Sequence, residues 1–377
     1  MCCRKLLFHA ALAVLLAAPL WAAEAPPTLE HTEVFASGRD GYHTYRIPSV
    51  IVTRKGTVLA FCEGRKHSGG DAGDIDLLLR RSEDGGKTFG PRQVVWDDKR
   101  NTCGNPCPVV DRASGTIWLL LTHNLGSDRE PQIIAGASQG TRTVWVCKSD
   151  DDGQTWSAPR EITADVKKPD WTWYATGPGA GIQLANGRLL VPCDHIEAES
   201  KLYFSHVIYS DDRGATWKLG GSAGPGTNEC EALQRSDGTL LLNMRNYTRQ
   251  HACRATATSS DAGATWSAVS WNEALPEPIC QASIRRLSLA RSGGKDRVLF
   301  SNPASKSKRE NLMVRLSEDE GQTWPVGKAL HAGPAAYSCL AVLPNGTILC
   351  LYERGAKGPY ETISLARFPL AWLMGAK

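Results

Sequence analysis

The sequence predicts an all-β repeat protein that folds as a six-bladed β-propeller. One eight-residue pattern, Ser-x-Asp-x-Gly-x-Thr followed by Trp or Phe, occurs five times, with copies roughly 50 to 70 residues apart. Runs rich in β-branched and aromatic residues precede the copies, and Asn-Gly or Asp-Gly turns separate the shorter strands between them. No long stretch of the sequence has the 3.6-residue period of an amphipathic helix.

Each copy of the pattern is typical of a tight hairpin. The Ser and Asp side chains can bond the backbone of the turn, Gly can adopt a positive φ, and the aromatic residue can pack between layers. A unit of about 60 residues with four short strands has the size of a propeller blade, and the chain accommodates six, five of them with the hairpin. The five copies are Ser82–Phe89, Ser149–Trp156, Ser210–Trp217, Ser259–Trp266 and Ser317–Trp324.

Residues 1–25 have the pattern of a secretory signal peptide. A basic start is followed by an apolar run from Leu6 to Leu20, and small residues between Ala22 and Ala25 suit cleavage. This run is too short to span a membrane, and no later stretch reaches about 18 apolar residues. We therefore expect an exported protein, periplasmic or secreted, whose propeller domain spans residues 26–377.

Composition narrows the range of partners. The formal net charge of +4 is too small and too evenly spread for a nucleic-acid partner, although it allows a site for a small anion. Cys2 and Cys3 lie in the leader, and we expect the other cysteines to be buried or disulfide-bonded, because no spacing indicates zinc. The acidic segment 150–153 lacks the Glu that completes a calcium loop. We expect no metal and no cofactor.

The hairpins have the sequence of the Asp box of sialidases, and several residues outside the repeats also resemble that family. Tyr45-Arg46-Ile47-Pro48 is similar to the signature on the first strand of the family. The resemblance implies that Arg46, Arg245 and Arg309 bind the carboxylate of a sugar, and planar, permanently charged guanidinium groups suit that task. Lys308 is an alternative to Arg309.

The same resemblance implies that the nucleophile is a Tyr. The sugar carbon that is attacked already bears a carboxylate, and a neutral phenol meets less charge repulsion there than a second carboxylate would. Tyr337 occupies that place, on a strand after the last Asp box. A phenol has an ordinary pKa of about 10, so it requires a base. Glu229 corresponds to this base, and Glu231 is its neighbour on the same face of the strand.

A glycine-rich loop, residues 64–76, precedes the first Asp box. The family has its general acid/base on such a loop, and the resemblance assigns this role to Asp71, whereas Asp74 and Asp76 are expected to belong to the following strand. Arg65 resembles the residue near the ring hydroxyls of the sugar, and Glu353 resembles the acid that orients Arg46. The aromatic residues of segment 171–174 line the pocket or pack between blades.

Together these similarities imply an exo-alpha-sialidase that hydrolyses terminal alpha-linked sialic acid with retention and acts on sialylated glycans. Two other functions fit the same residues. One is a hydrolase or transferase for a related nonulosonic acid, which would share the carboxylate-binding arginines. The other is a catalytically inactive sialic-acid-binding propeller, which would need the arginines but not Tyr337 with Glu229.

Overall fold

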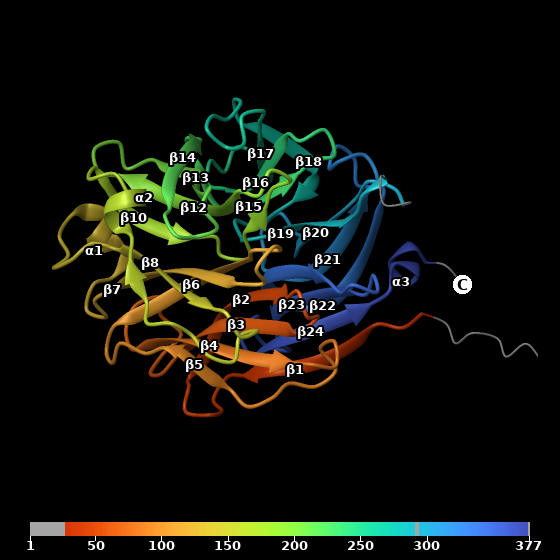
Figure 1. Ribbon diagram of the computed structural model, residues 1–377, viewed down its shortest axis with the longest axis horizontal. Helices are drawn as coiled ribbons and strands as arrows, with labels where there is room; N and C mark the ends of the chain where they lie inside the picture. The colour runs from red at the N-terminus through yellow and green to blue at the C-terminus, as the bar shows by residue number, and fades with distance from the viewer. Residues whose placement is uncertain (1–26, 291–293, 376–377) are drawn as a thin grey trace, which may run out of the picture.

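Antiparallel strands surround a central axis in the computed structural model, which describes residues 27–290 and 294–375. Figure 1 shows that the strands follow one another around the molecule in chain order, from β1 in red to β24 in blue. The predicted signal peptide lies outside the described residues. The described helices are short, and they are α1 (Glu130–Ala135), α2 (Thr163–Val166) and α3 (Leu370–Met374).

The first sheet contains eight strands. Its two halves meet where β4 and β6 pair in parallel at a single position, Ile75 opposite Thr102, while its other pairs are antiparallel. The strands are β2 (Thr44–Val52), β3 (Val58–Arg65), β4 (Ile75–Ser82), β5 (Gln93–Trp96), β6 (Thr102–Val110), β7 (Ile117–Asn124), β8 (Thr143–Ser149) and β9 (Arg160–Glu161).

The next two sheets contain five and four strands, all antiparallel to their neighbours. The five-stranded sheet comprises β10 (Trp171–Thr176), β11 (Ile182–Gln183), β12 (Leu189–Glu197), β13 (Tyr203–Ser210) and β14 (Lys218–Ala223). The four-stranded sheet comprises β15 (Thr227–Gln234), β16 (Leu240–Asn246), β17 (Cys253–Ser259) and β18 (Ser270–Pro276).

The last sheet joins the two ends of the described chain. β1 pairs antiparallel with β24, so a strand from the beginning of the chain completes a sheet built from its end. Figure 1 shows β1 beside β24, where the two ends of the described chain meet. The strands are β19 (Ser283–Ser288), β20 (Arg297–Pro303), β21 (Glu310–Ser317), β22 (Val326–Val342), β23 (Ile348–Arg354), β24 (Thr362–Phe368) and β1 (Glu30–Ala36).

All five predicted hairpins form, and they share one hydrogen-bond pattern. In each, the Ser hydroxyl donates to the Asp Oδ1 at 2.6 to 2.8 Å, and the Gly amide donates to the Ser hydroxyl at 2.7 to 2.9 Å. The Thr hydroxyl donates to the second Asp oxygen at 2.6 to 2.7 Å. The Gly residues have φ between 79° and 94°, which side chains with a Cβ disfavour. The sequence interpretation of the repeat is confirmed.

The aromatic residue that ends each hairpin packs into the core. Trp156 contacts Phe61 of β3 edge to face, with ring centroids 5.7 Å apart, and Trp217 contacts Trp118 of β7 at 6.4 Å. Both rings therefore reach strands from an earlier part of the chain. The hairpins thus connect successive groups of strands by burying a large apolar surface between them.

The ten cysteines among the described residues are all buried and unpaired. The sequence predicted that these cysteines are either buried or disulfide-bonded, and in the described part of the chain they are buried thiols. Within residues 27–290 and 294–375, none of the helices has the length and apolar character that crossing a membrane requires.

Replacing Asp151 with Ala should destabilise the fold by about 1–2 kcal/mol at pH 7, because the amides of Gln154 and Thr155 and two hydroxyl groups lose their acceptor. Asp151→Asn keeps one oxygen and should cost less. Burial alone would raise the pKa of Asp151, but these hydrogen bonds outweigh it and lower the pKa to about 2.

This lowered pKa predicts how the effect depends on pH. The carboxylate contributes stability above its unfolded pKa of about 4, and this contribution disappears as the pH falls towards 2. Urea unfolding of native protein and Asp151→Ala at pH 7, 4 and 2.5 should therefore give a difference that decreases at the lowest pH. An equal difference at all three values would contradict the assignment.

Candidate active site

The inner strands change register close to one end, and there they direct side chains into a common cavity. Pairing shifts between Arg46 and Ser49 in β2, between Thr227 and Cys230 in β15, and around Tyr337 in β22. Such bulges leave a residue unpaired and redirect its side chain. In β2 the bulge includes Ile47 at φ 61°, a left-handed conformation that is strained for a β-branched residue.

The resulting cavity has a volume of about 160 Å³, and most of its lining groups are polar. Seven residues selected from the sequence line it, and the eighth, Glu353, lies directly behind two of them. The seven are Arg46, Arg65, Asp71, Glu229, Arg245, Arg309 and Tyr337. Residues far apart in the sequence therefore meet at one end of the central axis.

Tyr337 and Glu229 form a hydrogen-bonded pair on this surface. The Tyr337 hydroxyl donates to Glu229 Oε1 at 2.6 Å, and Arg245 Nη1 donates both to Glu229 Oε2 at 2.6 Å and to the Tyr337 oxygen at 2.9 Å. Burial and the negative charge of Glu229 raise the pKa of Tyr337 well above its ordinary value, against the opposing effect of the arginines. The phenol is therefore protonated at neutral pH and has an acceptor in place for its proton.

Three guanidinium groups surround the Tyr337 ring. Those of Arg46 and Arg309 lie 5.1 and 5.5 Å from its centroid, and that of Arg245 bonds its hydroxyl. Arg309 Nη1 also donates to the hydroxyl of Tyr360 at 2.8 Å. The three predicted arginines therefore converge, which concentrates positive charge at the cavity wall.

Glu353 connects two sides of this site. It is fully buried, and its Oε1 accepts from Arg46 Nε at 2.7 Å and from the Ile47 amide at 2.9 Å. Its Oε2 accepts from the Tyr337 amide at 3.1 Å. One carboxylate thus fixes the bulged backbone of β2, the bulged backbone of β22 and the direction of Arg46.

Two nitrogen atoms of the arginines have no partner among the described residues. Arg46 Nη2 and Arg245 Nε are both buried, and neither donates a hydrogen bond. Buried charged donors without acceptors are costly. The cavity therefore suits an anion that brings two or more acceptor oxygens, and a carboxylate has that geometry.

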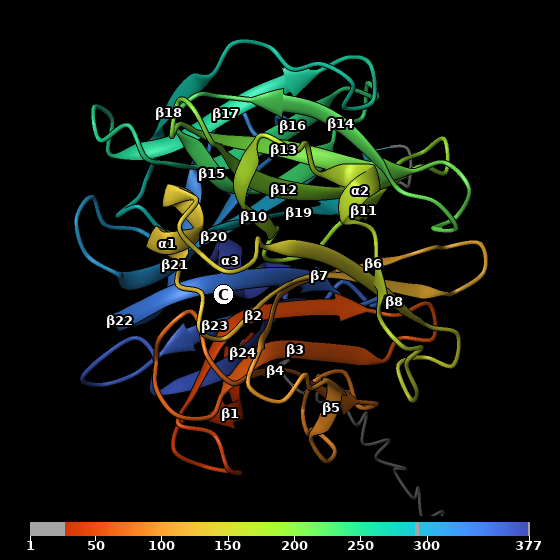
Figure 2. The ribbon, with the colours of Figure 1, turned by 90° about the vertical axis from the view of Figure 1, so that its left-hand side faces the viewer.

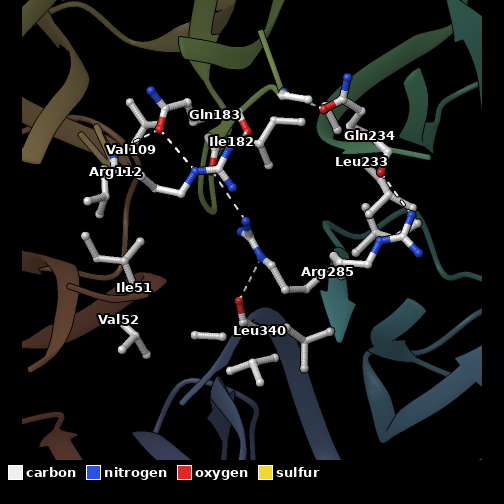
Figure 3. A pocket seen from close by; sticks show the side chains of 18 of the residues that line it. Ile51, Val52, Val109, Arg112, Ile182, Gln183, Leu233, Gln234, Arg285 and Leu340 are labelled. Atoms are coloured by element: carbon white, nitrogen blue, oxygen red, sulfur yellow. Dashed lines mark hydrogen bonds between the residues drawn. The ribbon is translucent and has the colours of Figure 1, made fainter. Parts of the chain in front are cut away.

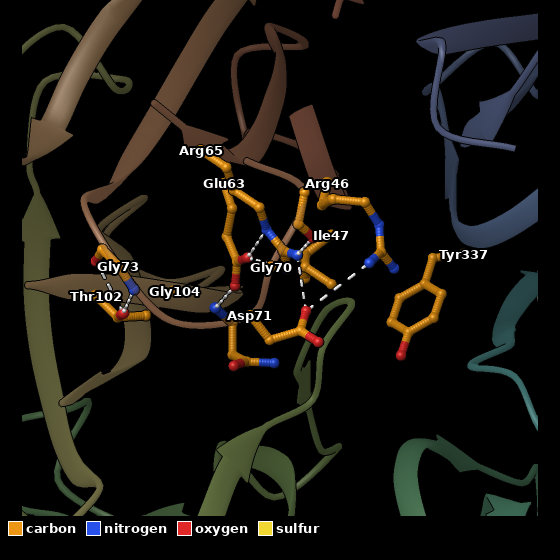
Figure 4. A network of polar contacts seen from close by, with 12 residues as sticks. Arg46, Ile47, Glu63, Arg65, Gly70, Asp71, Gly73, Thr102, Gly104 and Tyr337 are labelled. Carbon is orange, nitrogen blue, oxygen red and sulfur yellow. Dashed lines mark hydrogen bonds and ion pairs between the residues drawn. The ribbon is translucent and has the colours of Figure 1, made fainter. Parts of the chain in front are cut away.

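Asp71 lies at the mouth of the cavity, and its side chain is 64% exposed. Figure 4 shows its carboxylate facing Arg65 and Arg46, with Oδ1 at 2.7 Å from Arg65 Nη1 and 3.9 Å from Arg46 Nη1. Partial desolvation alone would raise the pKa of Asp71, but Arg65 and then Arg46 outweigh it and lower the pKa. The loop thus positions a carboxylate beside the arginines and within reach of solvent.

Lys66 holds the base of this loop. Its Nζ lies 2.8 Å from Asp74, 3.1 Å from Asp76 and 3.4 Å from Asp97. Among the described residues, these three carboxylates form the group that is compact enough to hold a metal ion. The lysine ammonium occupies the centre of the group and supplies the positive charge. Asp76 belongs to β4, as expected, and accepts from the Tyr42 hydroxyl.

The sequence interpretation missed several residues of the cavity. Glu63 accepts hydrogen bonds from Nε and Nη2 of Arg65 and from the backbone amide of Asn105. This position of Glu63 requires glycine at residue 104, because a Cβ on Gly104 would lie 2.3 Å from Glu63 Oε1. Figure 2 shows α1 beside β10, and this helix brings Glu130 to the cavity. No repeat or motif marks these positions, and the alternation of buried residues along a strand was the only available signal.

A second missed group lies opposite the arginine cluster. Asp194 is fully buried, accepts from Asn228 Nδ2 at 2.8 Å, and has an unpartnered Oδ2. Burial, with the charges of Glu229 and Glu130, raises its pKa well above the ordinary value, against the opposing effect of Arg142 and Arg245. Arg142 lies nearby with its guanidinium 4.1 Å from the centroid of Trp173. The cavity lining thus includes, besides the arginine cluster, a buried acid with an unpartnered oxygen and a further guanidinium.

The structure also separates the alternatives that the sequence left open. Lys308 is exposed, whereas Arg309 lines the cavity. Glu231 points away from it and accepts from Ser283 Oγ and from the amides of Ile284 and Ala180. Among the aromatic residues of β10, Trp173 lines the cavity, whereas Trp171 stacks on His195 with centroids 3.4 Å apart.

Comparison with known proteins identifies the family of this chain. A family profile described as a BNR repeat-like domain matches residues 56–350. A sialidase of Micromonospora viridifaciens is 37% identical over 368 residues, covering 93% of this chain. The chain belongs to the sialidase family.

Other relatives in the sialidase family extend this likeness. A sialidase of Bacteroides fragilis is 33% identical and aligns with 84% of this chain. The solved structure of the Hadza microbial sialidase Hz136 superimposes with a TM-score of 0.81 at 31% identity, covering 89% of this chain and 68% of that one. The present chain spans 55% of the Micromonospora relative and 61% of the Bacteroides relative.

Replacing Lys66 with Met should loosen the acidic loop, because three neighbouring carboxylates then repel one another without a cation between them. Hydrogen exchange of amides 66–74 is expected to accelerate about tenfold or more, while exchange in β2 and β3 stays unchanged. Lys148→Met is the matched control, since Lys148 pairs with the single acid Asp150 at the surface. Equal exchange of the loop in both variants would show that Lys66 does not hold it.

Proposed function

We propose that this chain is an exo-alpha-sialidase that hydrolyses terminal alpha-linked sialic acid from glycans with retention, using Tyr337 as nucleophile. The observation that carries the proposal is the 2.6 Å hydrogen bond from Tyr337 to Glu229 inside a cluster of three arginines. Glu229 and Glu353 bind Arg245 and Arg46, yet two nitrogens of these arginines still lack an acceptor beside the buried phenol. A carboxylate-bearing sugar supplies the missing anion, and the phenol supplies the nucleophile.

Substrate binding begins with the arginines in this proposal. The sugar carboxylate accepts hydrogen bonds from Arg46, Arg245 and Arg309, including those nitrogens that have no partner in the free protein. Glu353 keeps Arg46 in position through its bond to Nε. The carboxylate thereby orients the anomeric carbon towards the Tyr337 oxygen, and the cations also stabilise the charge distribution of the transition state.

Bond cleavage then proceeds in two displacements. In the first, protonated Asp71 gives its proton to the glycosidic oxygen, Tyr337 attacks the anomeric carbon, and its phenolic proton moves to Glu229. In the second, Asp71 removes a proton from water, which attacks the same carbon. Tyr337 departs and recovers its proton from Glu229. Two inversions give net retention, and both carboxyl groups return to their starting states.

We also propose the finer description of the fold and the export route. The strands divide into six groups around the axis, five of four strands and one of five, because β22 pairs with β21 through Val326–Pro334 and with β23 through Ala335–Val342. One long strand thus serves two blades, and β1 completes the last. Residues 1–25 would direct export, and residues 26–377 would form a single catalytic domain.

Tyr337→Phe tests the proposed nucleophile. Release of methylumbelliferone from its alpha-sialoside should fall at least about a thousandfold in kcat, because the attacking oxygen is removed. Tyr209→Phe is the control, since Tyr209 lies on β13 beside Arg188 and outside the cavity. Proton NMR of the native reaction should show the alpha anomer of sialic acid first.

The same assay separates the other candidate functions. Native protein that binds sialic acid but releases nothing from any sialoside would support a binding protein. Turnover of a deaminated nonulosonic acid glycoside alone would identify a related hydrolase, and transfer of the sugar to added lactose in preference to water would identify a transferase. Each of these results would replace the proposed activity.

The pH profile tests the role of Asp71. A general acid must be protonated, so kcat/KM declines as the pH rises through its pKa in the free enzyme. Arg65 is the main cause of the lowered pKa, and Arg65→Gln removes this charge and leaves Glu63 nearby. The decline should therefore move to higher pH by about one unit. An unmoved decline would contradict the assignment of Asp71.

A further inference from the structure

A second cavity, of about 380 Å³, lies at the other end of the inner strands. The same strands line both cavities. β15 contributes Glu229 to the candidate active site and Leu233 to this second cavity, and β22 contributes Tyr337 to the first and Leu340 to the second. The two cavities are therefore separate openings at opposite ends of the central axis.

Aliphatic side chains form the walls of the second cavity. Figure 3 shows Ile51, Val109, Ile182 and Leu233 around its edge, and each comes from a different inner strand. Such a surface favours an apolar group, since burying it removes hydrocarbon from water at about 25 cal/mol per Å². The volume also falls within the range of about 300–1,000 Å³ that is usual for ligand sites.

Arg285 extends into this apolar cavity without an acidic partner among the described residues. Its Nε donates to the Leu340 carbonyl at 3.2 Å and its Nη1 to the Gly181 carbonyl at 3.4 Å, both long for hydrogen bonds. Its Nη2 is buried and donates to nothing in the described chain. Glu231 lies nearby but is already bonded to three other donors.

Arg112 adds a second guanidinium at the rim. It is held by the side-chain oxygen of Gln183 at 3.1 Å and by the Gln183 carbonyl at 2.8 Å, which are both uncharged. Figure 3 shows both guanidinium groups between Gln183 and Leu340. The neighbouring Arg286, by contrast, forms an ion pair with Glu320. Arg235 also lines the cavity, and its Nε donates to the Glu320 carbonyl. Arg285 and Arg112 thus face this space without an acid bonded to either one in the described chain, so an anion is the complementary occupant.

We propose that this cavity is a second binding site, separate from the candidate active site, for a small carboxylate with an aliphatic body. The carboxylate accepts from Arg285 Nη2 and from the guanidinium of Arg112. The aliphatic part lies against the walls formed by the inner strands. The site goes beyond the proposed sialidase activity and does not depend on it.

Octanoate is the probe. Calorimetric titration of the full chain should show binding of one octanoate with a dissociation constant of about 1 mM or lower, and octanamide, which has the same chain without the charge, should bind at least about tenfold more weakly. Octanoate should also raise the melting temperature. Arg285→Gln should reduce its affinity at least about tenfold, whereas Arg160→Gln, an exposed arginine that bonds a backbone carbonyl, should leave it unchanged.

A second variant keeps the test independent of the role of Arg285 in folding. Val342 is partly exposed and lines the cavity, so Val342→Trp should fill the space and abolish binding in a folded protein. Hydrolysis of sialosides should remain as in the native protein, because this residue is remote from Tyr337. No octanoate binding, equal binding of octanamide, or full binding by Val342→Trp would overturn the proposal, and none of these results would affect the assay of Tyr337→Phe.

Discussion

Mutual repulsion among three guanidinium groups is the constraint that shapes this molecule. Arg46, Arg245 and Arg309 come from distant parts of the chain and surround one phenol ring. Two buried acids offset part of this charge, because Glu229 binds Arg245 and Glu353 binds Arg46, while Arg309 bonds the Tyr360 hydroxyl. Each acid also makes a second contact, since Glu229 accepts a hydrogen bond from the Tyr337 hydroxyl and Glu353 holds two bulged strands. The positive charges of the arginines make the cavity suitable for an anion, and the same charges require buried acids nearby to offset their repulsion.

The repeated hairpins provide the rigidity that this arrangement needs. Each Asp side chain bonds the backbone and the Thr hydroxyl of its own turn, and the aromatic residue then packs into the core. These contacts lie away from the cavity and are the same in every copy. Stability is therefore supplied by the repeat, while the inner strands are free to carry bulges and strained residues such as Ile47.

The central axis has different properties at its two ends. Near the beginning of the inner strands, ion pairs and unpartnered nitrogens make a polar cavity, whereas near their end aliphatic side chains surround the guanidinium groups of Arg285 and Arg112. Glu231 lies between them and connects neighbouring strands through Ser283 and two amides. This buried acid separates the openings, so ligands at the two ends need not compete.

The sequence by itself determined the all-β class, the five hairpins and the residues around which the site is built. Local chemistry explains this success, because an Asx turn, a positive-φ Gly and a buried Trp depend on neighbours within eight positions. The resemblance to sialidases supplied Arg46, Asp71, Glu229 and the other selected residues, which occur once each. Neither source could identify Glu63, Asp194 or Arg142, since an isolated acid or base on a strand looks the same whether it faces solvent or a cavity.

Tertiary structure decided which of the neighbouring candidates face the cavity. Arg309 faces it and Lys308 does not, and Glu229 faces it while Glu231 points elsewhere. Lys308 and Arg309 precede β21, and the loop that they end decides which of them reaches the cavity. In β15 a bulge causes the difference between the two glutamates, because one extra residue in a strand reverses the side on which the following side chains lie. Such a shift depends on pairing with strands far away in the chain. The convergence of the arginines on Tyr337 likewise depends on distant pairing, since only the arrangement of the sheets in space brings residues more than a hundred positions apart within hydrogen-bond distance.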